Sequence, residues 1–67
     1  MNWQQIEGNW TQFKGHVQRK WGELTDDDLN VIQGDRRILV GKLQERYGDR
    51  REVIEKQVDE WFDGLKS

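Results

Sequence analysis

The fold of this chain is decided by two matching stretches, WQQIEGNWTQFKGHVQRKWG at residues 3–22 and LNVIQGDRRILVGKLQERYG at residues 29–48, which align with an offset of 26. Glycines keep their places between the copies, with Gly8, Gly15 and Gly22 aligned with Gly34, Gly41 and Gly48. Apolar positions keep their character, as where Phe13 aligns with Leu39. A unit this short cannot cover its own apolar face, so we predict a duplicated helical unit whose copies pack on each other.

Apolar residues that recur every three or four positions predict one short and one longer helix in each copy. In the first copy the short helix surrounds Trp3 and Ile6, and the longer helix spans about residues 9–21. In the second copy the short helix ends at Gly34, and the longer helix spans about residues 35–48.

A last helix is predicted at about residues 50–63, with Asp49 as its cap. Its apolar stripe consists of Val53, Ile54, Val58, Trp61, Phe62 and Leu65. No stretch alternates with the period of a strand. We therefore predict an all-α fold: a single domain over residues 1–67, formed by a small bundle of four to five helices with two pseudo-repeated helical hairpins.

The aligned glycines predict helix ends and helix contacts. Gly22 and Gly48 follow the longer helices, where a left-handed C-cap is expected. Gly15 and Gly41 fall inside these helices, where glycine costs about 1 kcal/mol relative to alanine. We expect a second backbone to approach closely at these two glycines; the alternatives are the approach of a partner or ligand, or a kink.

A start signal for the short helix of the second copy is formed by Thr25 and the three aspartates that follow it, Asp26, Asp27 and Asp28. A hydroxyl cap with carboxylates in the first turn suits the positive end of the helix dipole. A calcium loop would instead stagger its ligands and place a glycine at the turn. We interpret the run as capping and not as a cation site.

Composition sets limits on the class of protein. The chain has no cysteine, which excludes disulfides and fits a reducing compartment. Its net charge is −2 and its mean hydropathy is −1.11, so nothing global attracts it to nucleic acid or anionic membrane. Because no signal peptide or membrane-spanning apolar run is recognisable, we expect a cytoplasmic monomer without membrane insertion.

Residues suited to catalysis are few. His16 is the only histidine and lies off the apolar face, and Ser67 is the only serine. An isolated histidine cannot form a multi-histidine metal site, and no nucleophile lies beside a base. We predict that the protein is not an enzyme and has no catalytic, metal or cofactor site.

One group of basic residues suggests an interaction surface: Arg36, Arg37, Lys42, Arg46, Arg50 and Arg51. We call this group the basic strip. Lys42 and Arg46 lie four positions apart on one side of the predicted helix, and Arg50 would follow if that helix continued. Such a strip can bind phosphates, but acidic residues such as Glu45 interleave with it, and a solvated face with ion pairs is the alternative interpretation.

Four tryptophans in a chain of this length can serve either as core or as exposed contacts. Trp10, Trp21 and Trp61 lie on predicted apolar faces and are assigned to the core. Trp3 lies in the short first segment, where we expect it to be exposed and to be the best candidate for a self-association contact.

Three blocks of this sequence carry a family resemblance: FKGHVQRKWGELTDDDL, IQGDRRILVGKLQERYG and EKQVDEW. Together they resemble the CsbD-like family of small bacterial general stress response proteins over roughly residues 5–62. The resemblance implies a small SAM-like bundle of two crossing helical hairpins, expression under stress, a cytoplasmic setting and no known enzyme activity. His16 and Glu23 stand where lysine is common in the family, and the resemblance transfers no functional residues.

Two functions follow as hypotheses. The first is a non-enzymatic stress-response protein that acts through abundance or weak surface contacts with unknown partners, as the hydrophilic composition suggests. The alternative is a nucleic-acid-binding module that uses the basic strip of residues 36–51.

Overall fold

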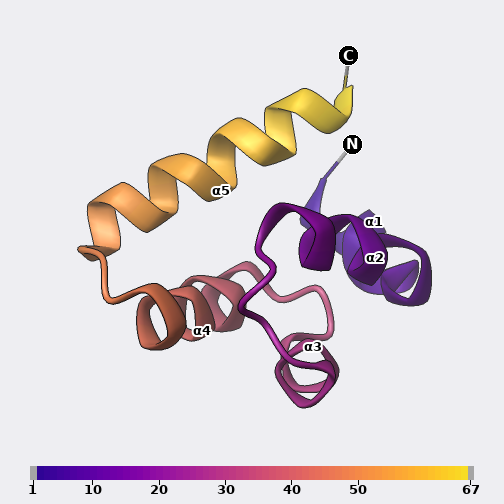
Figure 1. The fold of residues 1–67 in the computed structure, drawn as a ribbon. Helices are drawn as coiled ribbons and strands as arrows, with labels where there is room; N and C mark the ends of the chain where they lie inside the picture. Colours follow the sequence, from indigo (N-terminus) through magenta and orange to yellow (C-terminus); the bar gives the residue numbers. More distant parts are fainter. Residues whose placement is uncertain (1, 67) are drawn as a thin grey trace.

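Five helices make up the computed structural model, which describes residues 2–66. They are α1 (Trp3–Gly8), α2 (Trp10–Lys20), α3 (Asp26–Ile32), α4 (Arg36–Tyr47) and α5 (Arg51–Lys66). No strand occurs within the described range, so the predicted all-α class is confirmed. Figure 1 shows the long helix α5 lying across the others, with its end on the same side as the start of α1.

Side-chain caps fix where three of the helices begin. Thr25 Oγ1 accepts the Asp28 N–H at 3.1 Å, and Asp28 Oδ2 accepts the Thr25 N–H at 3.0 Å, which confirms the predicted capping role of this run. Asp35 caps α4 in a similar way. A second capping box, between Asn2 and Gln5, holds the first turn of α1.

The last helix differs from its prediction at both ends. It begins at Arg51, where the Ile54 N–H donates to the Arg50 carbonyl at 3.1 Å, and Asp49 makes no side-chain hydrogen bond to it within the described residues. It ends at Lys66 and not near residue 63. Val53, predicted in the apolar stripe, is 44% exposed. The buried face of α5 is centred near Ile54, and the neighbouring Val53 lies about 100° around the helix from it.

A single cluster of buried apolar side chains joins all five helices. Its members are Ile6, Trp10, Val17, Trp21, Leu24, Leu29, Ile32, Leu39, Val40, Leu43, Ile54 and Val58. The predictions for Trp10 and Trp21 are confirmed, and Trp61 is half-buried against the cluster. Trp10 also satisfies its polar edge, since its Nε1–H donates to the Leu29 carbonyl at 2.8 Å and thereby ties α2 to α3.

The glycines act differently from their prediction. A Cβ added at Gly15 or Gly41 would meet nothing within 4 Å, so the expected backbone approach at these glycines is wrong. The close approach occurs at Gly34, where φ is +81° and an added Cβ would lie 2.7 Å from the Glu7 Cα. This contact joins the end of α1 to the loop after α3, and it excludes any side chain at residue 34.

Of the two predicted C-cap glycines, one has the predicted left-handed conformation and the other does not. Gly48 is left-handed, with φ +71°, and its N–H donates to the Gln44 carbonyl at 2.9 Å, as predicted. Gly22 is not left-handed; α2 ends instead at Trp21, with φ −123°, whose N–H donates to the Val17 carbonyl. The prediction for Gly22 is wrong because Trp21 is drawn into the core, and the chain there needs no reversal through the left-handed region.

Candidate interaction surface

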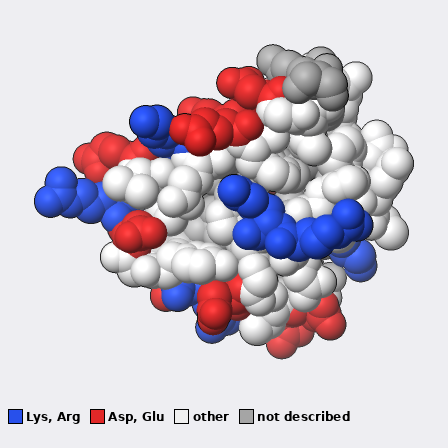
Figure 2. All heavy atoms as spheres, turned by 45° about the horizontal axis from the view of Figure 1, so that its top comes forward, with Lys and Arg blue, Asp and Glu red and all other residues white. Residues whose placement is uncertain are grey.

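Charged side chains of both signs are scattered over the surface, and Figure 2 shows them on one face of the molecule among a larger area without charge. Asp28 is the one charged residue that is buried among those described, with 3% exposed. Arg46 donates two hydrogen bonds to the Asp28 carboxylate, from Nε to Oδ2 at 2.8 Å and from Nη2 to Oδ1 at 3.0 Å. The Lys42 Nζ lies 3.9 Å from Oδ1. These contacts tie α4 to the start of α3.

The Arg46 hydrogen bonds hold the pKa of Asp28 well below its usual range. The backbone N–H of Thr25 acts in the same direction, and burial opposes both. Asp28 in turn raises the pKa of Arg46. The pair is therefore charged at any physiological pH, and Arg46 Nε and Nη2 both donate to Asp28 within the fold.

Arg36 makes a second cross-helix contact. Its Nη2 lies 3.0 Å from Asp59 Oδ1, and its Nη1 lies 3.6 Å from Glu55 Oε2, which joins the start of α4 to the middle of α5. Arg51 Nε lies 3.4 Å from the other oxygen of Glu55. Four members of the basic strip, Arg36, Lys42, Arg46 and Arg51, are thus already in ion pairs.

The structure does not bring the basic strip together as one surface. Lys42 and Arg46 turn toward α3, whereas Arg36 turns toward α5. The helix ends at Tyr47, so Arg50 does not continue its face. Arg37 and Arg50 make no ion pair among the described residues, and only two members of the strip, Arg37 and Arg51, line a common depression.

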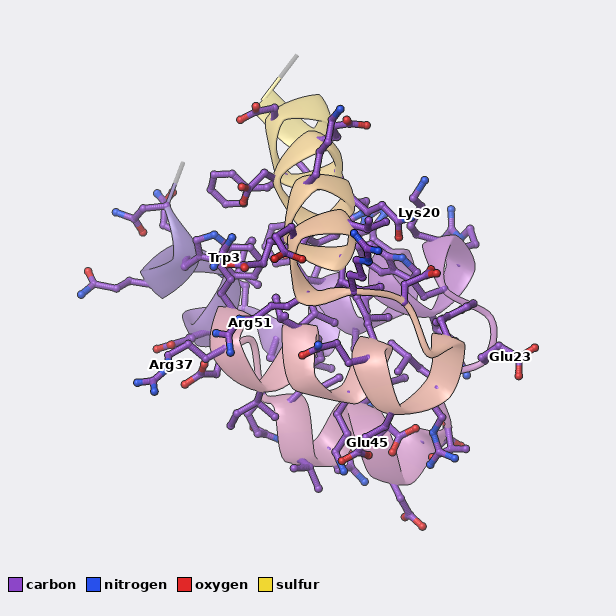
Figure 3. All side chains as sticks on the ribbon, turned by 90° about the vertical axis from the view of Figure 1, so that its left-hand side faces the viewer. Trp3, Lys20, Glu23, Arg37, Glu45 and Arg51 are labelled. Carbon is purple, nitrogen blue, oxygen red and sulfur yellow. The ribbon has the colours of Figure 1, made fainter. Side chains whose placement is uncertain are left out.

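That depression has a volume of about 330 Å³ and is also lined by Asp35 and Ile38. Figure 3 shows Arg37 and Arg51 on one side of α5, with Glu45 at a distance from both. The Asp35 carboxylate is occupied by the N–H groups of Arg37 and Ile38, at 2.8 and 3.3 Å. The depression therefore offers two exposed guanidinium groups and little enclosure.

Trp3 is half-buried, and its predicted exposure is wrong. Its ring stacks on Phe62 with 5.0 Å between ring centroids and 12° between planes, and it lies 6.2 Å from Trp61. The cap formed by Asn2 holds the segment in place. The Trp3 ring, which we expected to be available to another molecule, is in large part packed against α5.

A basic group that the sequence analysis did not single out lies on α2. This helix carries Lys14, Arg19 and Lys20 and no acidic residue. None of the three makes an ion pair with another described residue, in contrast to four of the six members of the basic strip. The signal in the sequence was the absence of Asp and Glu from residues 10–20, which leaves the basic side chains without intrahelical partners.

The CsbD-like family model matches residues 4–56. The chain belongs to the CsbD-like family. The matched range covers all of α1 but its first residue, α2 to α4 and the first part of α5, so it includes nearly all of both copies of the repeat and the first two quoted blocks.

Similar CsbD-like proteins come from several bacteria. A UPF0337 protein of Rhodopseudomonas palustris is 61% identical over 66 residues, which covers 98% of this chain and 100% of the relative. One from Pectobacterium atrosepticum is 57% identical, covering 98% of this chain and 96% of the relative. YjbJ of Escherichia coli K12 is 54% identical over 61 residues, covering 91% and 88%.

Outside these charged groups, the described part of this CsbD-like chain offers little that could support catalysis. Within the described residues no group of His, Cys, Asp and Glu could hold a metal ion, and no helix is long and apolar enough to cross a membrane. His16 is exposed, and its nearest aromatic neighbour is Phe13, with 6.1 Å between ring centroids. A second open depression, of about 390 Å³, is lined by Gln5, Asn9, Gln12 and Phe13 and contains no ionisable group.

Proposed function

We propose that this protein is a non-enzymatic, cytoplasmic component of the general stress response that acts through abundance and weak contacts of a strongly hydrated surface. One observation carries the proposal. Charged residues make up 36% of the chain, and among those described every one except Asp28 keeps its side chain at least partly in water. A small fold whose charged side chains lie in water has a strongly hydrated surface. We expect such a surface to form weak contacts and not tight ones.

The interior supports a role without catalysis. Among the described residues the one buried ionisable group is Asp28, which accepts hydrogen bonds from Thr25 and Arg46 and whose pKa these contacts hold well below its usual range. Catalytic carboxylates are usually poised near the working pH and face a cavity, and Asp28 does neither. The CsbD-like membership is consistent with the stress-response setting.

The ion pairs speak against the alternative, a nucleic-acid-binding module built on the basic strip. A phosphate on Arg36 or Arg46 would have to displace the carboxylates that these residues hold, and Arg37 and Arg50, which make no ion pair among the described residues, do not lie together with them on one face. Breaking the Asp28 pair would leave a buried charge without a partner, which is costly. No specific observation favours this alternative.

A drying experiment tests the proposed function. A sensitive enzyme is dried with the CsbD-like protein or with an equal mass of an unrelated small helical protein, and its activity is measured after rehydration. We expect greater recovery with the CsbD-like protein. A matched triple variant, D27A/D49A/K56A, removes three exposed charges that make no ion pair among the described residues, and it should protect less well. Equal recovery with the unrelated protein would refute the proposal.

A further inference from the structure

The two copies of the repeat each carry a depression at the start of their longer helix. With the offset of 26, Asn9 and Gln12 in the first copy align with Asp35 and Ile38 in the second, and each pair lines the depression of its own copy. The linings differ in chemistry, since the second copy presents charged groups and the first presents amides and an aromatic ring. We call the depression of the first copy the amide depression; it is lined by Gln5, Asn9, Gln12 and Phe13.

Helical spacing brings the lining of the amide depression together. Gln5 and Asn9 are four positions apart, as are Asn9 and Phe13, so these side chains follow one side of the junction between α1 and α2. The Asn9 side chain bridges this junction, because its Nδ2 donates to the Gln5 carbonyl at 3.1 Å. Figure 1 shows the two short helices lying next to each other. The lining is therefore formed by the fold and not by a single loop.

The amides of this lining keep hydrogen-bonding groups that the fold does not use. The exposed Gln12 side chain makes no hydrogen bond with another described residue. Gln5 Oε1 accepts the Asn2 N–H at 2.9 Å, while no described residue accepts from its Nε2. Asn9 donates through Nδ2, which leaves its Oδ1 as an acceptor. The depression thus offers both donors and acceptors, and none of them is charged.

Phe13 adds an apolar surface beside these amides. Its side chain is half-buried: it packs against the core cluster and also lines the depression. The aligned Leu39 of the second copy is completely buried and lines no depression. A partly exposed ring next to neutral amides therefore occurs in the first copy alone among the described residues.

We infer that the amide depression binds an uncharged saccharide. A pyranose ring presents C–H groups on its faces, which suit the Phe13 ring, and hydroxyl groups on its rim, which donate and accept as the amides do. The volume of about 390 Å³ lies within the range of small-molecule sites. Because the depression is open, we expect a dissociation constant on the order of 10 mM. This inference does not depend on the protectant role.

The chemistry of the lining favours a saccharide over other ligands. A nucleic acid binds mainly through its phosphates, and no basic residue lines the amide depression. A peptide segment could pair with the amides, but an extended peptide usually adds to the edge of a sheet, and residues 2–66 contain no strand. A saccharide uses both the aromatic ring and the neutral amides.

Titration with maltose tests the inference. Amide NMR signals of the ¹⁵N-labelled chain are followed up to about 200 mM maltose, with sorbitol as the control, because sorbitol has hydroxyl groups but no ring. We expect saturating shifts of the backbone amides of residues 5–13 and of the Gln12 side-chain amide with maltose alone. Gln12→Ile and Phe13→Leu introduce the residues of the second copy and should each raise the dissociation constant by about threefold to tenfold.

Gln18→Ile is the matched control, since it makes the same change at an exposed position of α2 outside the depression, and it should bind as the parent does. Circular dichroism checks the fold, and Gln12→Ile decides the test if Phe13→Leu does not fold. The inference would be overturned by a parent without saturating shifts, by equal shifts with sorbitol, or by a Gln12→Ile chain that binds as well as Gln18→Ile. Saturating shifts of these amides with cytidine or triglycine, but not with maltose, would also overturn it.

Discussion

Replacement of Gly34 by alanine should destabilise this protein far more than the same change at the other glycines. Two features of residue 34 act together. Its φ of +81° is in the left-handed region, and an alanine Cβ would lie 2.7 Å from Glu7 Cα, 2.9 Å from Glu7 N and 3.1 Å from Ile6 C. All three are backbone atoms, so no side chain can swing aside to make room, and α1 itself must move.

Two other glycines separate these effects. At Gly48 the φ of +71° is similar but nothing lies within 4 Å, so Gly48→Ala should cost only the left-handed strain of about 1 to 2 kcal/mol. Gly34→Ala adds overpacking of about 1 to 3 kcal/mol and should cost roughly 2 to 5 kcal/mol in total. Gly15 is exposed within α2 with open space around it, so Gly15→Ala should stabilise by about 1 kcal/mol.

Urea unfolding followed by tryptophan fluorescence measures all three, since Trp10 and Trp21 are buried. A chain of this length has a total stability of roughly 3 to 10 kcal/mol, so a cost of about 2 to 5 kcal/mol should remove a large part of it and lower the urea midpoint of Gly34→Ala strongly. The order of stability should be Gly15→Ala, parent, Gly48→Ala, Gly34→Ala. If Gly34→Ala cost no more than Gly48→Ala, the backbone contact between the copies would be refuted.

Three further changes test contacts that cross between helices. Trp10→Phe removes the Nε1 donor to the buried Leu29 carbonyl and should cost about 1 to 3 kcal/mol in urea unfolding, whereas an unchanged midpoint would mean that the bond is absent. Trp3→Ala removes the ring stacked on Phe62 and should cost about 1 to 2 kcal/mol; a mobile Trp3 would leave the thermal midpoint unaltered. Asp28→Asn should lower the thermal midpoint at pH 7. Because the pKa of Asp28 is lowered in the fold, its stabilising effect is complete above the ordinary carboxyl pKa of about 3.9 and declines as the pH falls toward the lowered pKa. The gap between parent and variant should therefore narrow below about pH 4, and a constant gap would contradict the proposed charge pair.

The helix starts were predictable because their signals are local. Thr25 and Asp28 stand three positions apart, so their mutual capping depends on nothing outside one turn. The same signal was present at Asn2 and Gln5, and it could have been read. Had it been, the first segment would have been predicted as a held helix, and the exposure of its tryptophan would have been doubted.

The ion pairs were not predictable in the same way. Arg46 and Asp28 are 18 positions apart, and Arg36 and Asp59 are 23 apart, so their meeting depends on how α4 packs against α3 and α5. Helical spacing places Lys42 and Arg46 on one side of a helix but does not tell whether water or a carboxylate lies there. The helical spacing therefore placed Lys42 and Arg46 on one side of α4 correctly, but it could not show that a carboxylate faces them.

Residues that are identical between the copies do not have the same role, and this bears on where a function can arise. Gly8 and Gly34 align, yet a Cβ at Gly8 would meet nothing within 4 Å, whereas Gly34 is pressed against the backbone of α1. The copies thus pack asymmetrically. At an aligned position, packing restricts the choice of residue only in the copy where that residue makes a contact. Lys20 and Arg46 follow the same rule, since only Arg46 has a buried carboxylate to hold. A basic residue that the fold does not use can be kept, reversed or paired with another molecule at little cost to stability. The unpaired charges of α2 are therefore the part of this surface where binding can change without disturbing the core.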